Sequence, residues 1–157
     1  MSPKRSYLFR DLGGLLLLGI CLLSSVRAES PTVITPAEAY TKVRAGELVL
    51  IDVRTPAEWQ QSGIPERAIP IDLRQEGGPK AFQQAVLDAV KGDRNRPIAV
   101  ICAGGTRSAH AQQILEQAGF THVQDISEGV TGRSSETGWI HRGLPMTPCK
   151  DCNQSPQ

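Results

Sequence analysis

The sequence predicts an α/β fold with a mainly parallel central sheet of about five strands, flanked by helices on both faces. Three observations predict it: short apolar runs alternate with amphipathic stretches, the helical stretches begin at capping signals, and the connections are short. The chain has 157 residues, of which 39% are hydrophobic and 21% are charged. This composition suits one globular domain with a core of its own.

The helices are predicted from their first residues. Thr35 and Glu38 have the spacing of a capping box, with Pro36 at the first helical position, so a helix is expected over residues 35–46. The same signature recurs at Thr55. Further helices are expected within residues 55–61, 77–92 and 108–119, and strands at residues 48–53, 68–73, 98–102 and 122–126.

The first 28 residues are expected to be a secretory signal peptide. Lys4 and Arg5 form a basic start, residues 12–23 are a purely apolar run, and Ala28 stands at a small-residue cleavage position. The apolar run is well short of the roughly 20 residues that a membrane-spanning helix needs. The mature protein is therefore expected in the periplasm or outside the cell.

Three alternatives use the same leader residues: an uncleaved membrane anchor, lipid attachment at Cys21, and a twin-arginine-like signal in KRSYLF. After cleavage, the expected organisation is one domain over residues 32–148 and a flexible tail over residues 149–157 that carries a CxxC motif.

Cleavage of the leader changes the charge of the chain. It removes four of the 17 basic residues and one of the 16 acidic residues, which leaves 13 and 15 and a net charge of about −2. No nucleic-acid partner and no membrane association of the cleaved protein are expected from this balance.

Three cysteines remain in the mature chain. Cys149 and Cys152 are separated by only two residues, so they are expected to pair as a disulfide in an oxidising compartment. Cys102 is then the single free thiol.

Cys102 stands where a nucleophile is expected. It follows a buried strand, and open α/β sheets place their ligand sites at the carboxyl ends of strands. The residues AGGT after it form a turn with little side-chain bulk, and a helix begins near Arg107. Backbone N–H groups and a helix N-terminus favour the thiolate form of a cysteine. The alternative is a small buried apolar residue at the end of a strand.

Four motifs, in order, give the chain a family resemblance. LVLIDVRTPAEW, SGIPERAIPIDL, CAGGTRS and GWIHRGLPM resemble the strand, loop, active-site and closing segments of single-domain rhodaneses of the exported bacterial type. The C-x-x-x-x-R loop is one residue shorter than that of cysteine phosphatases, which suits a single sulfur atom better than a phosphate. The resemblance covers about residues 35–148.

The resemblance implies a rhodanese-like fold and a sulfurtransferase that works without a cofactor. Cys102 would attack the sulfane sulfur of a small donor such as thiosulfate, become a persulfide, and pass the sulfur to cyanide or a thiol. The loop amides would bind the persulfide, with Gly104 and Gly105 permitting the turn. The expected substrate-binding residues are Ala103, Gly104, Gly105, Thr106, Arg107 and Ser108.

Two of these residues have specific expected roles. Arg107 is expected either to close the loop or to support the anionic donor electrostatically, and the alternative is a solvent-facing side chain. Ser108 is expected to cap the following helix.

The sequence departs from the family pattern at two places. Gly63 replaces a histidine, Glu66 replaces a glycine and Arg67 is an insertion, which puts substrate choice in doubt. Glu128 replaces a glycine after the last strand, and residues 130–138 form a longer, more polar approach to the next motif. Neither change is expected to touch the cysteine loop.

Other conspicuous residues are expected to have structural roles. Asp52, Arg54 and Glu58 are interpreted as hydrogen-bonding and capping residues of the scaffold. Trp59 is expected in the core, whereas Trp139 follows a glycine in a late loop and is expected at the mouth of the site.

Two other functions stay open. One is a rhodanese module that binds a partner or carries sulfur to a protein acceptor, and the other is a thiol oxidoreductase that uses the CxxC tail. A metal site is not expected, because the three histidines lie far apart and two cysteines supply only half a zinc site.

Overall fold

The computed structural model describes residues 32–133 and 137–150. The expected signal peptide and Cys152 lie outside the described residues. No helix in the described part of the chain is long and apolar enough to cross a membrane.

Four parallel strands form the central sheet, in the order β3 (Ile69–Pro70), β1 (Val49–Asp52), β4 (Ile98–Ile101) and β5 (Val123–Ile126). Each lies within a run that the sequence predicts as a strand. Beyond β5, Val33 adds one parallel bridge to Asp125. The sheet thus has four strands where about five were expected.

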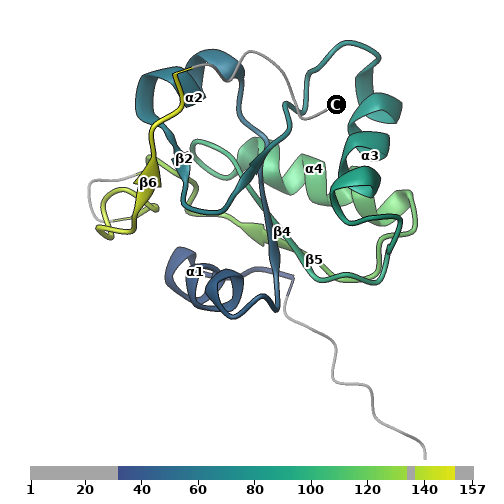
Figure 1. Cartoon of the computed structure of the whole chain (residues 1–157), viewed down its shortest axis with the longest axis horizontal. Helices are drawn as coiled ribbons and strands as arrows, with labels where there is room; N and C mark the ends of the chain where they lie inside the picture. The colour runs from purple at the N-terminus through teal and green to yellow at the C-terminus, as the bar shows by residue number, and fades with distance from the viewer. Residues whose placement is uncertain (1–31, 134–136, 151–157) are drawn as a thin grey trace, which may run out of the picture.

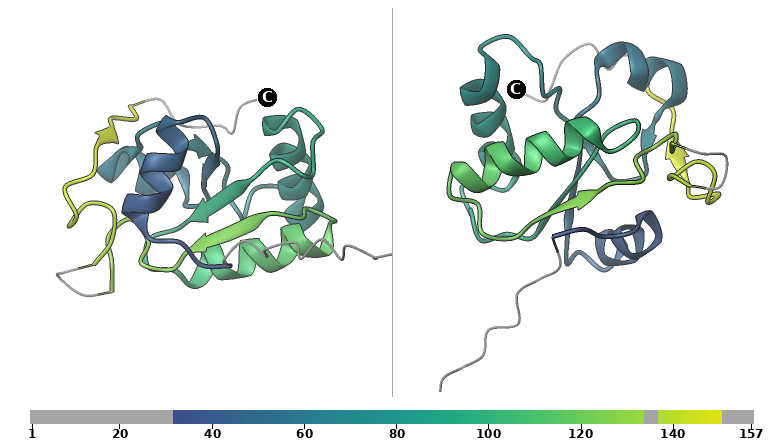
Figure 2. Two further views of the ribbon diagram at one scale, coloured as in Figure 1. Left: turned by 90° about the horizontal axis from the view of Figure 1, so that it is seen from below. Right: turned by 180° about the vertical axis from the view of Figure 1, so that it is seen from behind.

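Helices cover both faces of the sheet, as Figures 1 and 2 show. On one face, α1 (Pro36–Arg44) packs with the apolar side chains of residues such as Leu50 and Ile101. On the other face, α3 (Gly78–Ala89) and α4 (Thr106–Gln117) bury Phe82, Val86 and Leu115 against the sheet. The α/β fold predicted from the sequence is confirmed.

The capping boxes form as the sequence predicts. Thr35 caps α1 and Thr55 caps α2 (Pro56–Ser62), and in each box the glutamate three residues later bonds back to the cap. The glutamate of the second box is Glu58, which also reaches α4, as described below.

Two features were not predicted. Strands β2 (Ile64–Pro65) and β6 (Met146–Thr147) form a separate antiparallel pair (Figure 1). In addition, α4 begins at Thr106, two residues earlier than expected, because Gly105 in a left-handed conformation turns the chain into the helix without a side-chain cap.

Candidate active site

The thiol of Cys102 lies at the carboxyl end of β4, between the sheet and the start of α4. Its side chain is buried, and the Gly105 N–H group donates a hydrogen bond to Sγ at 3.1 Å. The Ser108 hydroxyl lies 3.5 Å from the same sulfur. Cys102 is the free cysteine of the described residues. The sulfur therefore already has hydrogen-bonding partners of the kind that stabilise an anion.

The carbonyl groups of the cysteine loop are bound on its outer side by residues 130–133. Three successive carbonyls accept hydrogen bonds from this segment. They are Val130 N–H to Cys102 O (2.8 Å), Thr131 N–H to Ala103 O (3.0 Å) and Arg133 Nε to Gly104 O (2.6 Å).

This arrangement fixes the direction of the loop amides. In a trans peptide the C=O and N–H groups point to opposite sides, and no described peptide bond is cis. Because the Gly104 carbonyl is bound by Arg133, the Gly105 N–H group of the same peptide faces the opposite side. The Gly105 N–H group, at 3.1 Å from Sγ, shows directly that this is the side of the sulfur.

Two glycines allow the loop and the segment after β5 to lie in backbone contact. Gly105 has φ +90°, and a Cβ there would lie 2.0 Å from the Ser127 carbonyl oxygen. Gly129 has φ +71°, and a Cβ there would lie 2.2 Å from the Ala103 oxygen. Gly104 is different, since the nearest atom to its Cβ position would be 3.6 Å away. Of the two loop glycines singled out in the sequence, only Gly105 is required by the backbone.

Arg107 reaches away from the loop to α2. Its guanidinium donates two hydrogen bonds to the Glu58 carboxylate, at 2.6 and 2.7 Å, and both side chains are about one quarter exposed. The hydrogen bonds from Arg107 lower the pKa of Glu58 to about 2. Of the two roles predicted for Arg107, this geometry favours loop closure, because much of its charge is already balanced by a carboxylate.

Ser108 does not cap α4. It lies inside the first turn, where its hydroxyl donates to the Gly105 carbonyl at 3.1 Å and contacts Cys102. The expected capping role was wrong because the helix starts two residues earlier. Behind Ser108 lies Asp125 of β5, whose pKa is raised by burial, while Ser108 and the charge of Arg133 act in the opposite direction.

Asp52 and Arg54 form a buried ion pair at 2.7 Å next to the site. Arg54 also donates to the Ser62 hydroxyl and the Gly63 carbonyl, each at 2.7 Å, which joins the end of β1 to the end of α2. These contacts hold the segment after β1 against the end of α2, which fits the scaffold role expected for Asp52 and Arg54.

The two tryptophans are both fully buried. Trp59 lies in the interior, as predicted. Trp139 was expected at the mouth of the site, and this was wrong. It packs in the core on the α1 face, edge-to-face with Tyr40 at 5.7 Å between ring centroids, and its indole N–H donates to the Pro145 carbonyl.

Sequence reasoning missed the contribution of residues 127–133. The departures from the family pattern after β5 were expected not to touch the cysteine loop, but Gly129, Thr131 and Arg133 all contact it. A signal was available. Two consecutive parallel strands that pair with each other bring the segments after them to the same edge of the sheet.

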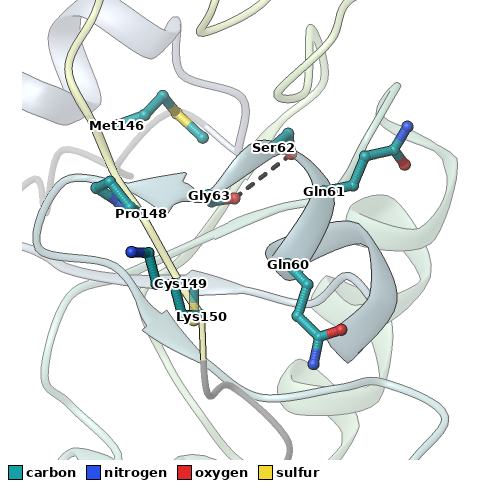
Figure 3. A pocket seen from close by; sticks show the side chains of 8 residues that line it. All are labelled: Gln60, Gln61, Ser62, Gly63, Met146, Pro148, Cys149 and Lys150. Atoms are coloured by element: carbon teal, nitrogen blue, oxygen red, sulfur yellow. Dashed lines mark hydrogen bonds between the residues drawn. The ribbon is translucent and has the colours of Figure 1, made fainter.

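The start of the tail lies beside a cavity that is separate from the cysteine loop. Figure 3 shows this pocket, of about 340 Å³, between the end of α2 and the chain after β6. Cys149 and Lys150 line it, and no residue of the cysteine loop does. Cys149 is disulfide-bonded. Since Cys152 lies outside the described residues, the Cys149–Cys152 pairing stays a prediction.

The described residues contain no cluster of three side chains able to hold a metal ion.

The chain is similar to several known proteins. It is 31% identical over 101 residues to protein RP600 of Rickettsia prowazekii, covering 61% of this chain and 80% of the relative. It is 36% identical over 75 residues to the thiosulfate sulfurtransferase PspE of Escherichia coli, covering 48% of this chain and 64% of PspE. The crystal structure of a rhodanese-related protein from Thermoplasma volcanium superposes with a TM-score of 0.52 at 29% identity, covering 75% of this chain and 99% of that one.

The match to a protein family extends over most of the described chain. Residues 35–136 match the rhodanese-like domain, and this range contains the sheet, the cysteine loop and the segment that backs it. Relatives with this domain include proteins named as sulfurtransferases. The chain therefore belongs to the rhodanese-like domain family, a family of sulfurtransferases.

Proposed function

We propose that this protein transfers a sulfane sulfur from an anionic donor such as thiosulfate to a thiol or cyanide, through a persulfide on Cys102. One observation carries the proposal. The Cys102 sulfur accepts a hydrogen bond from the Gly105 N–H group at 3.1 Å and lies 3.5 Å from the Ser108 hydroxyl, at the start of α4. Such donors stabilise a thiolate before the reaction and a persulfide after it.

The proposed reaction has two displacement steps. In the first, the Cys102 thiolate attacks the outer sulfur of thiosulfate, the sulfur–sulfur bond of the donor breaks, and sulfite leaves with the electron pair. In the second, cyanide or a thiolate attacks the terminal sulfur of the persulfide, and Cys102 leaves as a thiolate. The thiolate is thus regenerated at the end of each cycle.

The surroundings of the sulfur favour a small donor. The loop is short, and Cys102 is only 1% exposed, which leaves little room for a bulky donor at the sulfur. The name of the relative PspE supports thiosulfate as the donor class. The expected leader supports a place in the periplasm or outside the cell, where the disulfide at Cys149 would persist.

Replacement of the nucleophile tests the proposal. Cys102→Ser should reduce transfer from thiosulfate to cyanide by at least about 10³-fold, because an alcohol is nearly isosteric with the thiol but forms no stable anion at neutral pH. Circular dichroism should be unchanged. The matched control is the double variant Cys149→Ser and Cys152→Ser, which removes the tail cysteines and should keep the activity.

Intact mass supplies a second measurement. After incubation with thiosulfate, the wild-type protein should gain the mass of one sulfur atom and Cys102→Ser should not. Activity near the wild-type value in Cys102→Ser would place the nucleophile elsewhere and overturn the proposal.

A further inference from the structure

We propose that Arg133 is a positioning residue for Cys102, acting through the peptide group between Gly104 and Gly105 to favour the anionic form of the sulfur. Arg133 comes from the segment after β5 and does not touch the sulfur. The inference rests on the proposed function, in which the Cys102 thiolate is the nucleophile.

Two hydrogen bonds, at the two ends of one peptide group, connect Arg133 to the sulfur. Its Nε donates to the Gly104 carbonyl oxygen at 2.6 Å, and the N–H of the same peptide group donates to Cys102 Sγ at 3.1 Å. A cation at the carbonyl end of a peptide pulls electron density toward the oxygen, and the N–H at the other end becomes a stronger donor. Arg133 therefore strengthens the one loop hydrogen bond that the structure shows reaching the sulfur.

A second contact holds the guanidinium in this orientation. Arg133 Nη2 lies 3.3 Å from the Thr106 hydroxyl oxygen, at the first residue of α4. The Arg133 Cγ atom also lies 3.6 Å from the Cβ position of Gly104. The side chain thus lies along the outer side of the loop, although it is exposed to solvent.

Arg133 differs from Arg107 in how its charge is used. Arg107 is paired with the Glu58 carboxylate in a two-pronged contact. In the described part of the chain, Arg133 has no carboxylate within ion-pair distance, and its two hydrogen bonds go to neutral oxygen atoms. Its positive charge is consequently available to act on the loop.

Several other charged groups surround the same sulfur and must stay constant in a test. They are Arg107 on α4 with Glu58 on α2, Asp52 and Arg54 at the end of β1, and Asp125 on β5. On the α3 side the neighbours are apolar, with Phe82 and Val86 in the core that contains Cys102. A variant of Arg133 leaves each of these side chains in place. Loss of its charge would also make Asp125 harder to ionise, and that would favour the Cys102 anion, opposite to the effect proposed here.

The experiment is the pH dependence of Cys102 alkylation by iodoacetamide in the full chain under non-reducing conditions. Arg133→Gln should move the pH midpoint of alkylation upward by about half a unit to one unit, because the thiolate loses support. Arg133→Lys keeps the charge but loses the Nε geometry, so it should show a smaller upward shift.

The matched control is Arg96→Gln. Arg96 is exposed and also donates to a glycine carbonyl at 2.6 Å, that of Gly46. It lies just before β4, at the amino end of the strand, whereas the cysteine loop follows the carboxyl end. The Arg96→Gln variant loses the same charge and the same kind of contact. The alkylation midpoint of its Cys102 should equal that of the wild type. Equal midpoints for Arg133→Gln, Arg96→Gln and the wild type would overturn the inference.

This readout is independent of sulfur transfer. Alkylation needs no sulfur donor, so failure of the proposed function would appear as transfer activity in Cys102→Ser, whereas failure of this inference would appear as an unshifted midpoint in Arg133→Gln. Thermal unfolding checks that each variant is folded. Should Arg133→Gln fail to fold, the midpoint of Arg133→Lys decides: an upward shift supports the inference, and the wild-type value overturns it.

Discussion

Two regions hold the cysteine loop, and they do so by different kinds of contact. Helix α2 reaches it through one ion pair, Glu58 with Arg107, made by the ends of two long side chains. The segment of residues 127–133 lies against it backbone to backbone, at Gly105 and Gly129. The first contact depends on charge and is screened by solvent, whereas the second depends on the absence of side-chain atoms.

The difference determines what each region can control. An ion pair between side chains that are about one quarter exposed can weaken without moving the backbone, so α2 is expected to adjust the stability of the loop. The backbone contacts set the direction of the loop amides, and a change there moves the groups that face the sulfur. The segment of residues 127–133 is therefore the stricter of the two supports of the cysteine loop, in the sense that it tolerates less change in the position of the loop.

The largest effect is expected at Gly105. Gly105→Ala forces a Cβ to within 2.0 Å of the Ser127 carbonyl oxygen at a φ of +90°, which an alanine adopts with strain. We expect a loss of more than about 2 kcal/mol in the free energy of unfolding, together with loss of sulfur transfer.

The neighbouring glycine provides the control for this variant. At Gly104→Ala the new Cβ lies 3.6 Å from Arg133 Cγ and 3.8 Å from the Gly132 carbonyl oxygen, both ordinary contacts, so stability should change by less than about 0.5 kcal/mol. Urea unfolding measures both variants. Similar losses at the two positions would show that the backbone contact is not what makes this support strict.

A smaller effect is expected when the ion pair to α2 is removed. Glu58→Gln keeps an oxygen for the capping box with Thr55 but loses the charge that pairs with Arg107. Because solvent screens this pair, we expect a loss of about 1 kcal/mol or less at neutral pH. The control is Glu38→Gln, at the same position of the α1 capping box, where no arginine of the described residues contacts the glutamate.

The pH dependence of this loss has a definite sign. The pKa of Glu58 falls from 4.5 to about 2 on folding, mainly through the hydrogen bonds from Arg107. Its stabilising contribution is complete above pH 4.5 and is lost as the pH falls toward about 2. The difference in unfolding free energy between the wild type and Glu58→Gln should shrink over this range, and a difference that stays constant would exclude the ion pair as its source.

Local patterns in the sequence predicted the scaffold better than the site. The capping boxes at Thr35 and Thr55 and the buried runs before Asp52 and Cys102 depend on neighbours in the chain, and each is present in the structure. The contact between the cysteine loop and residues 127–133 joins segments more than twenty residues apart. No residue pattern within either segment reveals it, because the contact depends on the order of the strands.

Two individual errors have separate physical origins. The start of α4 was placed at Ser108 because serine is a common cap, but a glycine in a left-handed conformation carries no side-chain signal. Trp139 was placed at the mouth of the site because it follows a glycine in a loop. Its burial results from α1, which is distant in the sequence and supplies Tyr40 as a ring partner.

The smallest expected effect separates hydrogen bonding from charge within the stricter support. The Ala103 carbonyl accepts two hydrogen bonds from Thr131, one from its N–H at 3.0 Å and one from its hydroxyl at 3.1 Å. Thr131→Val removes only the hydroxyl, keeps the shape of the side chain and leaves the backbone bond that orients the peptide. Since Thr131 is exposed, the free energy of unfolding should fall by about 0.5 kcal/mol or less, measured by urea unfolding. The alkylation midpoint of Cys102 should stay at the wild-type value, because no charge is lost and the Gly104–Gly105 peptide is untouched. A midpoint shifted as far as in Arg133→Gln would show that any loosening of the segment alters the sulfur, and that the charge of Arg133 has no separate part in it.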